Sequence, residues 1–444
     1  MSAKLRLVFS ITMVFASFYG AAQSNYWKDT DLSRAEERVT LKRFAVQKAS
    51  AYTLDEARFK RQLVSISKSQ SSSGVVYFPD EHGKQVPFEV VEANTFSKEL
   101  SQKYPSIKSY KGTSTFNDGK RIRFSVSHKG IHSMMSTTGN GGSVFMEKGD
   151  SDTYVLYHAK DLAAREAFVC NTLPELSEMG NSLSARLVND QVLRKFRLAV
   201  AASGEYTNFH GGTKIDALAA INATVTRINE VFENDLAITL ELVGNTDEVI
   251  YLDPETDPFT GSLTSQTQNT LDTVIGDANY DIGHLFNQKD NVSDGNAGSV
   301  GTVCRTGTKG SAYSTLSSPQ GEAFAIDWVA HEMGHQFGAN HTFSYASEGT
   351  QAQIEPGSGT TIMGYAGISG ENNVALNSDA YFHYVSLVQM RDYLETVSCG
   401  ESMPLTNVPP SLVPLTDFTI PKGTAFVLNG NASDSDVDDM LTYT

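Results

Sequence analysis

The stretch HEMGHQFGANH, residues 331–341, decides how the second half of the chain folds. Its first two histidines are four residues apart in a segment with helical apolar spacing, and residues four apart lie on one face of a helix. Both imidazoles can therefore reach one ion. Gly338 allows the left-handed backbone that ends a helix, so the chain can double back and bring a third histidine to the same ion.

Three neutral imidazoles, His331, His335 and His341, leave one position of a tetrahedral site open, as in catalytic rather than structural zinc. Glu332 is next to the first ligand but offset from it, where its carboxylate can hold a water and act as general base. Chance would give this spacing in 444 residues with a probability on the order of one in ten thousand or less. We therefore predict a catalytic zinc site here. Of the remaining histidines, four lie in the N-terminal region, and His210, His284 and His383 lack ligand spacing.

The composition limits the kind of protein that surrounds this site. The 444 residues suggest two or three domains, and a hydrophobic fraction of 40% is enough for ordinary globular cores. The formal net charge of -16, without any Lys/Arg-rich run, repels phosphate backbones and argues against a nucleic-acid partner. The oligomeric state stays open.

The first residues have the pattern of a signal peptide. Lys4 and Arg6 precede an apolar run at residues 7–18, and small residues at 20–22 provide a cleavage site. An apolar run of about 12 residues is too short to span a bilayer comfortably. We predict a signal peptide over residues 1–22, no membrane span, and a secreted or cell-surface location.

Residues 23–190 alternate short apolar runs with polar turns, which is strand patterning. The clearest runs are residues 75–78, 88–91 and 122–126. We predict a β-rich prodomain over residues 23–190, ending in an exposed linker that begins near Leu173.

Residues 191–400 have the pattern of an α/β domain. Strand patterns occur at residues 196–200, 238–243 and 280–286, and helical patterns at residues 213–232, 324–337 and 387–397. The order strand, helix, strand, strand predicts a mainly parallel twisted sheet with long helices. Ser386 and Gln389 have the spacing of a capping box at the start of the last helix.

Residues 401–444 begin with a proline-rich linker and continue with strand-like runs at 418–420 and 426–428. We predict the start of a truncated Ig-like β-domain, because a whole sandwich needs roughly 100 residues. Asp434 to Asp439 resemble a calcium loop, and a solvated acidic turn explains them equally well.

The segment TIMGY, residues 361–365, follows the third histidine as a Met-turn would. The zinc motif followed by this turn resembles the metzincin peptidases. Within them the sequence is most similar to the reprolysin-like group, and to a bacterial branch with runs like residues 203–206 and 331–342. The likeness covers about Arg194 to Cys399 and implies a zinc-dependent endopeptidase acting on proteins or peptides.

The resemblance also bears on the turn and on two cysteines. Met363 would form a hydrophobic floor under the histidines. Tyr365 matches the astacin and serralysin pattern, in which this tyrosine can bind zinc, and both a metal or oxyanion role and a place in the pocket wall stay open. The resemblance implies a Cys304–Cys399 disulfide between the end of the edge strand, placed at residues 298–303, and the last helix. The loop at residues 342–362 lacks the cysteines of many relatives, so it must be held differently.

Cys170 is the odd cysteine, about 25 residues before the catalytic domain. Metzincin prodomains often place a cysteine thiolate on the zinc, where it displaces water and keeps a zymogen latent. A buried free cysteine in a β-domain is the alternative. We expect the latency switch, because one disulfide leaves a third cysteine over.

Two other functions compete with a peptidase. An inactive adhesin would not need Glu332, and a hydrolase of non-peptide bonds would not explain the Met-turn and the prodomain. We therefore predict a secreted zinc endopeptidase, made as a latent zymogen, whose substrate pairs as an added β-strand with residues 298–303.

Overall fold

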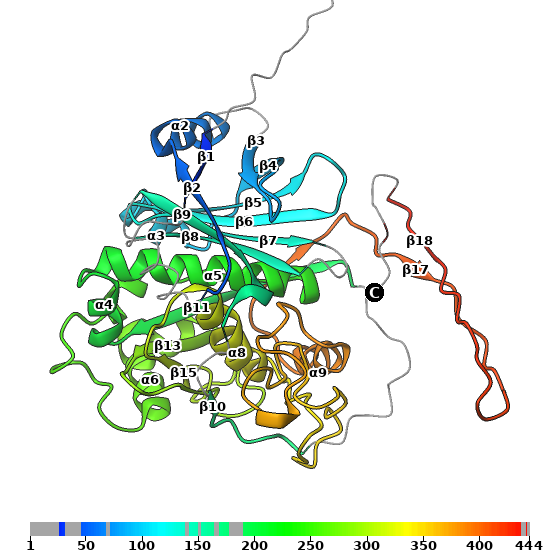
Figure 1. Ribbon diagram of the computed structural model, residues 1–444. Coiled ribbons are helices and arrows are strands. Elements are labelled where there is room, and N and C mark those ends of the chain that lie inside the picture. The colour runs from blue at the N-terminus through cyan, green and yellow to red at the C-terminus, as the bar shows by residue number, and fades with distance from the viewer. Residues whose placement is uncertain are drawn as a thin grey trace, which may run out of the picture.

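The computed structural model describes residues 26–31, 46–67, 72–137, 142–149, 152–163, 168–176, 190–436 and 441. Two β-sheets lie above and below a long helix, and a thin arm projects from the side (Figure 1). The predicted signal peptide, residues 1–22, lies outside the described residues. In the described part of the chain, none of the helices has both the length and the apolarity to cross a membrane.

The first sheet is built from the N-terminal region, and all its strand pairs are antiparallel. Its order is β1-β2-β9-β8-β7-β6-β5-β4-β3. The elements are β1 Trp27–Thr30, β2 Ser50–Leu54, α2 Glu56–Ser67, β3 Ser73–Pro79, β4 Gln85–Glu92, α3 Lys98–Lys103, β5 Lys108–Ser114, β6 Lys120–Ser127, β7 Gly130–Thr137, β8 Ser143–Lys148, β9 Thr153–His158 and η1 Ala159–Asp161. The three strand runs expected from the sequence lie in β3, β4 and β6, and helix α2 covers part of one face through Phe59, Leu63 and Ile66.

The second sheet is mixed, with the order β10-β14-β15-β13-β11-β12 and β16 added to β11. The pairs among β15, β13, β11 and β12 are parallel, whereas β14 and β16 run antiparallel to β15 and β11. Its elements are β10 Val169–Cys170, β11 Val192–Ala202, β12 Ile238–Leu242, β13 Ile282–Gln288, β14 Asp294–Asn296, β15 Ala312–Leu316 and β16 Glu401–Pro404. Around it lie α4 Gly204–His210, α5 Lys214–Leu236, η2 Thr246–Val249, α6 Leu263–Leu271, η3 Asp272–Gly276, η4 Asp277–Asn279, η6 Gly370–Asn372 and α9 Tyr384–Leu394. The expected α/β architecture is therefore present, with antiparallel additions at its edges.

Helix α5 lies between the two sheets (Figure 1). It begins where the sequence predicts, because the Thr213 side chain accepts a hydrogen bond from Asp216 N and caps the first turn. Leu218, Val225 and Ile228 are fully buried in the core shared with the second sheet. Its opposite side faces β5, β6 and β7 of the first sheet.

The zinc-motif helix is one helical stretch in three parts: α7 Gly321–Ala323, the π-helical η5 Phe324–Ala330, and α8 His331–Gln336. Single π-helical turns are rare and occur mostly at functional sites. Gly338 has φ +108°, so the helix ends at the position and by the left-handed turn that the sequence predicts.

The edge-strand prediction was wrong in position. The last strand that the peptidase domain supplies at this side of the sheet is β14, Asp294–Asn296, with β10 of the N-terminal region beyond it, and residues 298–303 form no strand. Gly298 and Gly301 have positive φ, which breaks the extended backbone. The amides of residues 301–303 instead donate to the carbonyl oxygens of His335 and Gln336, so this segment caps the end of α8.

The capping-box prediction was also wrong. Helix α9 begins three residues earlier than expected, and its N-cap is His383, whose Nδ1 accepts from Val385 N. Ser386 is buried inside the first turn. Gln389 points back to the zinc motif, where its Oε1 accepts from Asn340 N at 2.9 Å.

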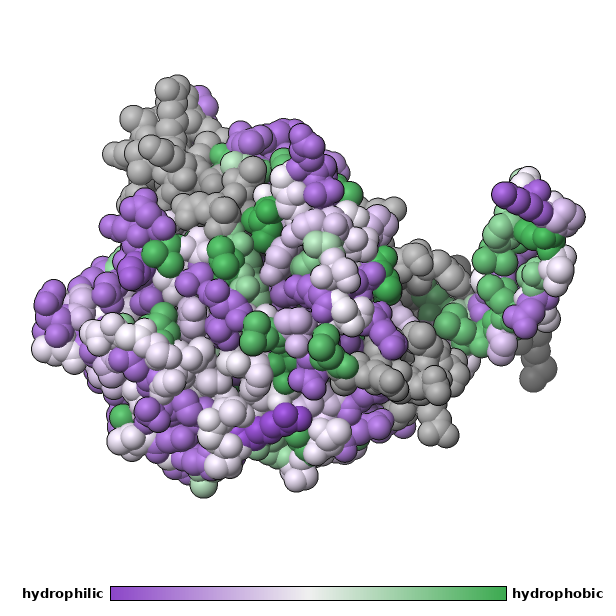
Figure 2. Space-filling view, turned by 90° about the horizontal axis from the view of Figure 1, so that it is seen from below, coloured by the Kyte–Doolittle hydropathy of each residue, from purple (hydrophilic) through white to green (hydrophobic). Residues whose placement is uncertain are grey.

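The arm contains residues 405–436 of the tail. Its strands are β17 Ser411–Leu412 and β18 Ala432–Ser433, whereas the runs at 418–420 and 426–428 form no strand and stay exposed. Figure 2 shows hydrophobic residues gathered on this arm. Strand patterning produces a strand only where a partner strand pairs with it, so an Ig-like domain stays a prediction. Of the acidic run, Asp434 and Asp436 are described and belong to no metal-binding cluster, whereas Asp438 and Asp439 lie outside the described residues.

Candidate metal centre

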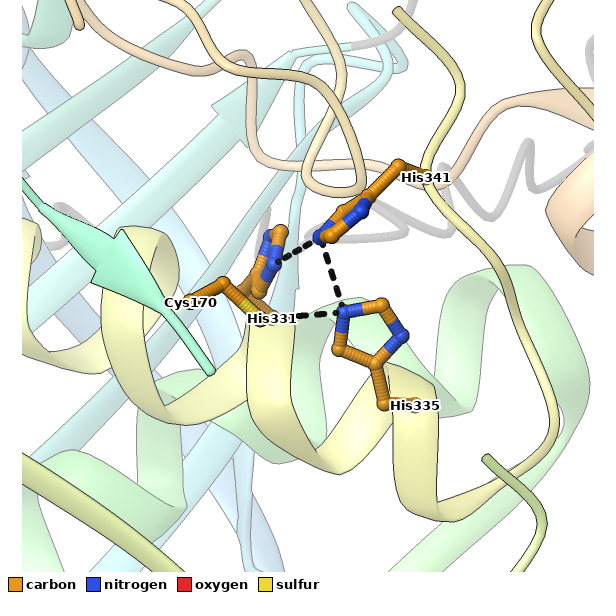
Figure 3. Close-up of side chains that lie close together, drawn as sticks. All are labelled: Cys170, His331, His335 and His341. Carbon is orange, nitrogen blue, oxygen red and sulfur yellow. Dashed lines mark hydrogen bonds between the residues drawn. The ribbon is translucent and has the colours of Figure 1, made fainter. Parts of the chain in front are cut away.

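Four side chains from separate parts of the chain meet at one point (Figure 3). Cys170 comes from β10, His331 and His335 from α8, and His341 from the segment after the helix. Their potential ligand atoms all lie within 4.8 Å of one another, and no other such group of side chains occurs among the described residues. The three histidines predicted as ligands and the predicted latency cysteine are thus in one place.

The spacing of these atoms is that of a tetrahedral site. His341 Nε2 lies 3.3 Å from His331 Nε2 and 3.1 Å from His335 Nε2. Zn–N bonds of about 2.0–2.1 Å at tetrahedral angles place two nitrogens about 3.3 Å apart. Cys170 Sγ is 3.5 Å from His335 Nε2, where a Zn–S bond of about 2.3 Å predicts about 3.6 Å. The donor set fits zinc with one thiol at the fourth corner.

The opposite nitrogen of each ring has its own acceptor. His331 Nδ1 lies 2.7 Å from Ile362 O, and His335 Nδ1 lies 2.7 Å from Ala339 O. A carbonyl oxygen only accepts, so Nδ1 carries the proton and Nε2 presents a lone pair. Burial, together with the neighbouring imidazoles, holds the pKa of His335 well below its usual value, so the ring is in the neutral form that binds metals.

Glu332 lies beside the ligands and is fully buried. Its Oε2 accepts a hydrogen bond of 2.9 Å from Thr172 Oγ1. Burial raises the pKa of this carboxyl to about 8, against the opposing effect of the hydrogen bonds from Thr172 and Cys170. Edge strand β14 passes so close that a Cβ on Gly295 would meet Glu332 Oε1 at 2.4 Å.

The segment around Cys170 is seated on the edge strand. Strand β10 pairs in parallel with β14, and Asn171 N donates to Gly295 O at 2.8 Å. Thr172 Oγ1 accepts from Ala297 N at 2.7 Å while it donates to Glu332. Sequence reasoning missed Thr172, because nothing near it in the chain marks it as a partner of a residue 160 positions away.

Met363 and Tyr365 lie on two sides of the histidines. Met363 is fully buried, and a Cβ on Gly334 would meet its Sδ at 2.5 Å, so the sulfur packs under α8 between the two helical histidines. The Tyr365 ring centroid is 4.7 Å from that of His341 and 6.1 Å from that of His331. Burial raises its pKa. Tyr365 thus packs against the histidines, and both a metal or oxyanion role and a place in the pocket wall stay predictions.

The loop without cysteines is held by a buried carboxylate that the sequence analysis did not single out. Glu355 accepts from the hydroxyls of Thr342 and Thr361, and from the amides of Thr360 and Thr361. It thus ties the residue after the third histidine to the residue that opens the Met-turn. A second missed residue is Glu348, whose two carboxylate oxygens each lie 3.0 Å from His341 Nδ1. The sequence did contain a signal for both residues. Glu348 and Glu355 are acidic residues in the loop at 342–362, which has no cysteine and so needs other contacts to hold it.

The Cys304–Cys399 disulfide is present, as the family resemblance implied. It joins the segment that caps α8 to the chain just after α9. Cys170 is the free cysteine among the described residues.

Comparison with known proteins agrees with this geometry. Residues 193–394 match the family model of the reprolysin-like metallopeptidases of family M12B. No curated protein matches the chain. Peptidases of this family use zinc, and the matched residues include the three clustered histidines and Glu332. Residues 193–394 therefore form a reprolysin-like metallopeptidase domain of family M12B, and this match supports a zinc metalloendopeptidase.

Proposed function

We propose that this chain is the latent, secreted form of a zinc endopeptidase, with zinc held by His331, His335 and His341. The observation that carries the proposal is the convergence of three imidazole Nε2 atoms and one thiol at tetrahedral spacing. Bound there, zinc supplies Lewis-acid polarisation of the scissile carbonyl and of the attacking water.

Glu332 is the general base in this proposal. Its carboxylate is buried beside the histidines and forms no ion pair within the described part of the chain, so it is available for proton transfer. Glu332 takes a proton from the attacking water at a carboxylate oxygen and then delivers it to the nitrogen of the leaving amine.

The substrate lies along β14 in this proposal. Ala297 N and the carbonyl oxygens of Ser293 and Gly295 all hydrogen-bond to residues 169–172 in the latent chain. These are the main-chain groups that an extended peptide would use as an added strand. Removal of the segment would make them available to a protein or peptide substrate.

Latency follows from the same contacts. Cys170 occupies the fourth corner of the site, and Thr172 occupies both Glu332 and Ala297 N. A thiolate binds zinc more strongly than water, so the site would be silent until the segment leaves. We place the signal peptide at 1–22, the prodomain at 23–190, the peptidase at 191–400 and the tail at 401–444, with activating cleavage between about residues 171 and 196.

Export and membership of the bacterial branch stay proposals. The charged start and apolar run of residues 1–22 support export, and the Cys304–Cys399 bond fits an oxidising compartment. The resemblance to the bacterial branch rests on residues 203–206 and 331–342.

The test compares casein hydrolysis by wild-type proenzyme and by Cys170→Ala. The wild type is expected to be inactive until cleaved, to be inhibited by a zinc chelator afterwards, and to recover with added zinc. Cys170→Ala is expected to self-activate faster, with Cys304 and Cys399 still bonded in both proteins. Activity that survives the chelator would refute the zinc mechanism, and equal latency in the two proteins would refute the cysteine switch.

A further inference from the structure

We infer that Glu348 is a positioning residue whose negative charge strengthens the hold of His341 on zinc; the inference rests on the zinc site proposed above. Glu348 Oε1 and Oε2 each lie 3.0 Å from His341 Nδ1, so the carboxylate accepts the ring proton with both oxygens. The side chains of His341 and Glu348 are only 2% and 22% exposed. Bulk water therefore screens this pair weakly.

The other two histidines are oriented differently. His331 and His335 share helix α8, so the backbone itself sets their relative position, and main-chain carbonyl oxygens accept from their Nδ1 atoms. His341 follows Gly338 in irregular backbone and has no helix to orient it. Its ring direction depends on a side-chain partner.

The chemical difference between these acceptors matters for metal binding. An imidazole that gives its Nε2 lone pair to a cation gains positive character at Nδ1–H. A carbonyl dipole stabilises that charge partly, whereas a carboxylate does so with a full negative charge. Removing the charge of Glu348 should therefore weaken zinc binding even when a hydrogen-bond acceptor of the same shape remains.

Glu348 is itself held in place. Its amide donates to Gln353 Oε1 at 2.7 Å, and Gln353 Nε2 donates to Phe343 O at 3.2 Å. One glutamine side chain thus closes the segment from residue 343 to residue 353 and aims the carboxylate at the histidine. These hydrogen bonds hold the loop without a disulfide, and they keep the charged Glu348 carboxylate beside His341.

The experiment measures zinc affinity in the full-length protein by competition with a chelator of known affinity. The variants are Glu348→Gln, which keeps an acceptor oxygen, Glu348→Ala, which removes it, and His341→Ala. Glu371→Gln is the matched control, because this exposed acid lies beyond the Met-turn. Visible spectra of the cobalt-substituted proteins report the ligand geometry without using activity, and circular dichroism checks the fold.

Glu348→Gln is expected to bind zinc roughly 10- to 100-fold more weakly than wild type, with Glu348→Ala at least as weak and Glu371→Gln unchanged. Wild-type affinity in Glu348→Gln would overturn the inference, even if Glu348→Ala binds weakly, since only a structural role would then remain. His341→Ala tests the underlying site separately. If it binds zinc as tightly as wild type, the proposed ligand set is wrong, whatever Glu348 does.

Discussion

Two of the contacts between the N-terminal region and the peptidase domain differ in size and chemistry: a broad contact with buried charges along α5, and a narrow segment at the metal centre. Along α5, Arg123 of β6 pairs with Glu230 and Glu233, and Arg227 pairs with Glu147 of β8. The side chains of Arg123, Arg227 and Glu147 are at most 4% exposed. These residues lie apart from the metal centre formed by Cys170, His331, His335 and His341.

The narrow contact has the opposite character. It consists of β10 and the residues just after it, and it places Cys170 at the histidines and Thr172 at Glu332. The contrast teaches that holding the N-terminal region and silencing the site are separate tasks. Buried charges at this contact also suit a separable part, because they can be solvated once the parts are apart, whereas apolar side chains of the first sheet such as Phe145 and Tyr157 share a core cluster with α5.

The largest expected effect is on catalysis and comes from Glu332, the carboxyl that the narrow contact covers. Glu332→Ala should lower casein hydrolysis by the cleaved enzyme by roughly a hundredfold or more, because the general base is lost. Zinc content should not change, and the cleaved parts should still co-elute, because α5 is untouched. Residual activity within tenfold of wild type would contradict the role of Glu332.

The broad contact is broken by Arg123→Ala. This change leaves Glu230 and Glu233 buried without their shared partner, which should cost about 3 kcal/mol, or roughly a hundredfold in the dissociation constant of the cleaved N-terminal region. Surface plasmon resonance on the separated parts measures it. The control is Arg58→Ala on the exposed side of α2, which should have no effect. Equal dissociation constants for the two variants would show that the α5 contact does not hold the region.

Thr172→Val tests the narrow contact, because it keeps the shape of the side chain and removes the hydroxyl that donates to Glu332. Loss of a hydrogen bond to a carboxylate costs about 1.5–3 kcal/mol, so self-activation should be roughly 10- to 150-fold faster. Thr172→Ser keeps the hydroxyl and is the matched control. Binding of the cleaved N-terminal region should change less than in Arg123→Ala; a larger change would mean that the two contacts are not separate.

The smallest effect concerns pH and the broad contact. Burial alone would raise the pKa of Glu147 and of Glu233, but the charges of Arg227 and His132 on the first and of Arg123 and Lys111 on the second outweigh it, so both pKa values are lowered. A carboxylate with a lowered pKa stabilises docking above its ordinary value of 4.5 and loses this contribution as the pH falls below it. The cleaved N-terminal region should therefore dissociate from the peptidase domain severalfold faster at pH 4 than at pH 7. Circular dichroism should show that both parts stay folded at the two pH values. Slower dissociation in acid would reverse the sign and reject the argument.

The metal centre was predictable to the extent that it is local. His331 and His335 are brought together by one turn of helix, and Gly338 marks the reversal that returns His341, so the spacing alone identifies all three. Thr213 likewise marks the start of α5 through its own side chain. The Cys304–Cys399 bond came from the family resemblance.

The errors occurred where a pattern needed a distant partner. The edge strand was placed at residues 298–303, yet β14 is the segment that pairs with β15, and the glycines of the predicted stretch instead turn the backbone toward the end of α8. Ser386 and Gln389 have capping-box spacing, but the N-cap is His383, whose side chain accepts the hydrogen bond from the amide of Val385. In both cases a competing contact, absent from the local pattern, decided the outcome.

By itself, the sequence determined the three histidines, the position of Glu332 beside them, the Met-turn that follows, and the alternation that makes the first sheet, because helical and strand periodicity place side chains within a few residues of one another. Only the tertiary structure decided that Thr172 covers Glu332, that Glu348 supports His341, and that α5 presents its charged side to the first sheet. These contacts depend on which surfaces pack together after the elements have formed, and no local spacing encodes a partner 160 residues away.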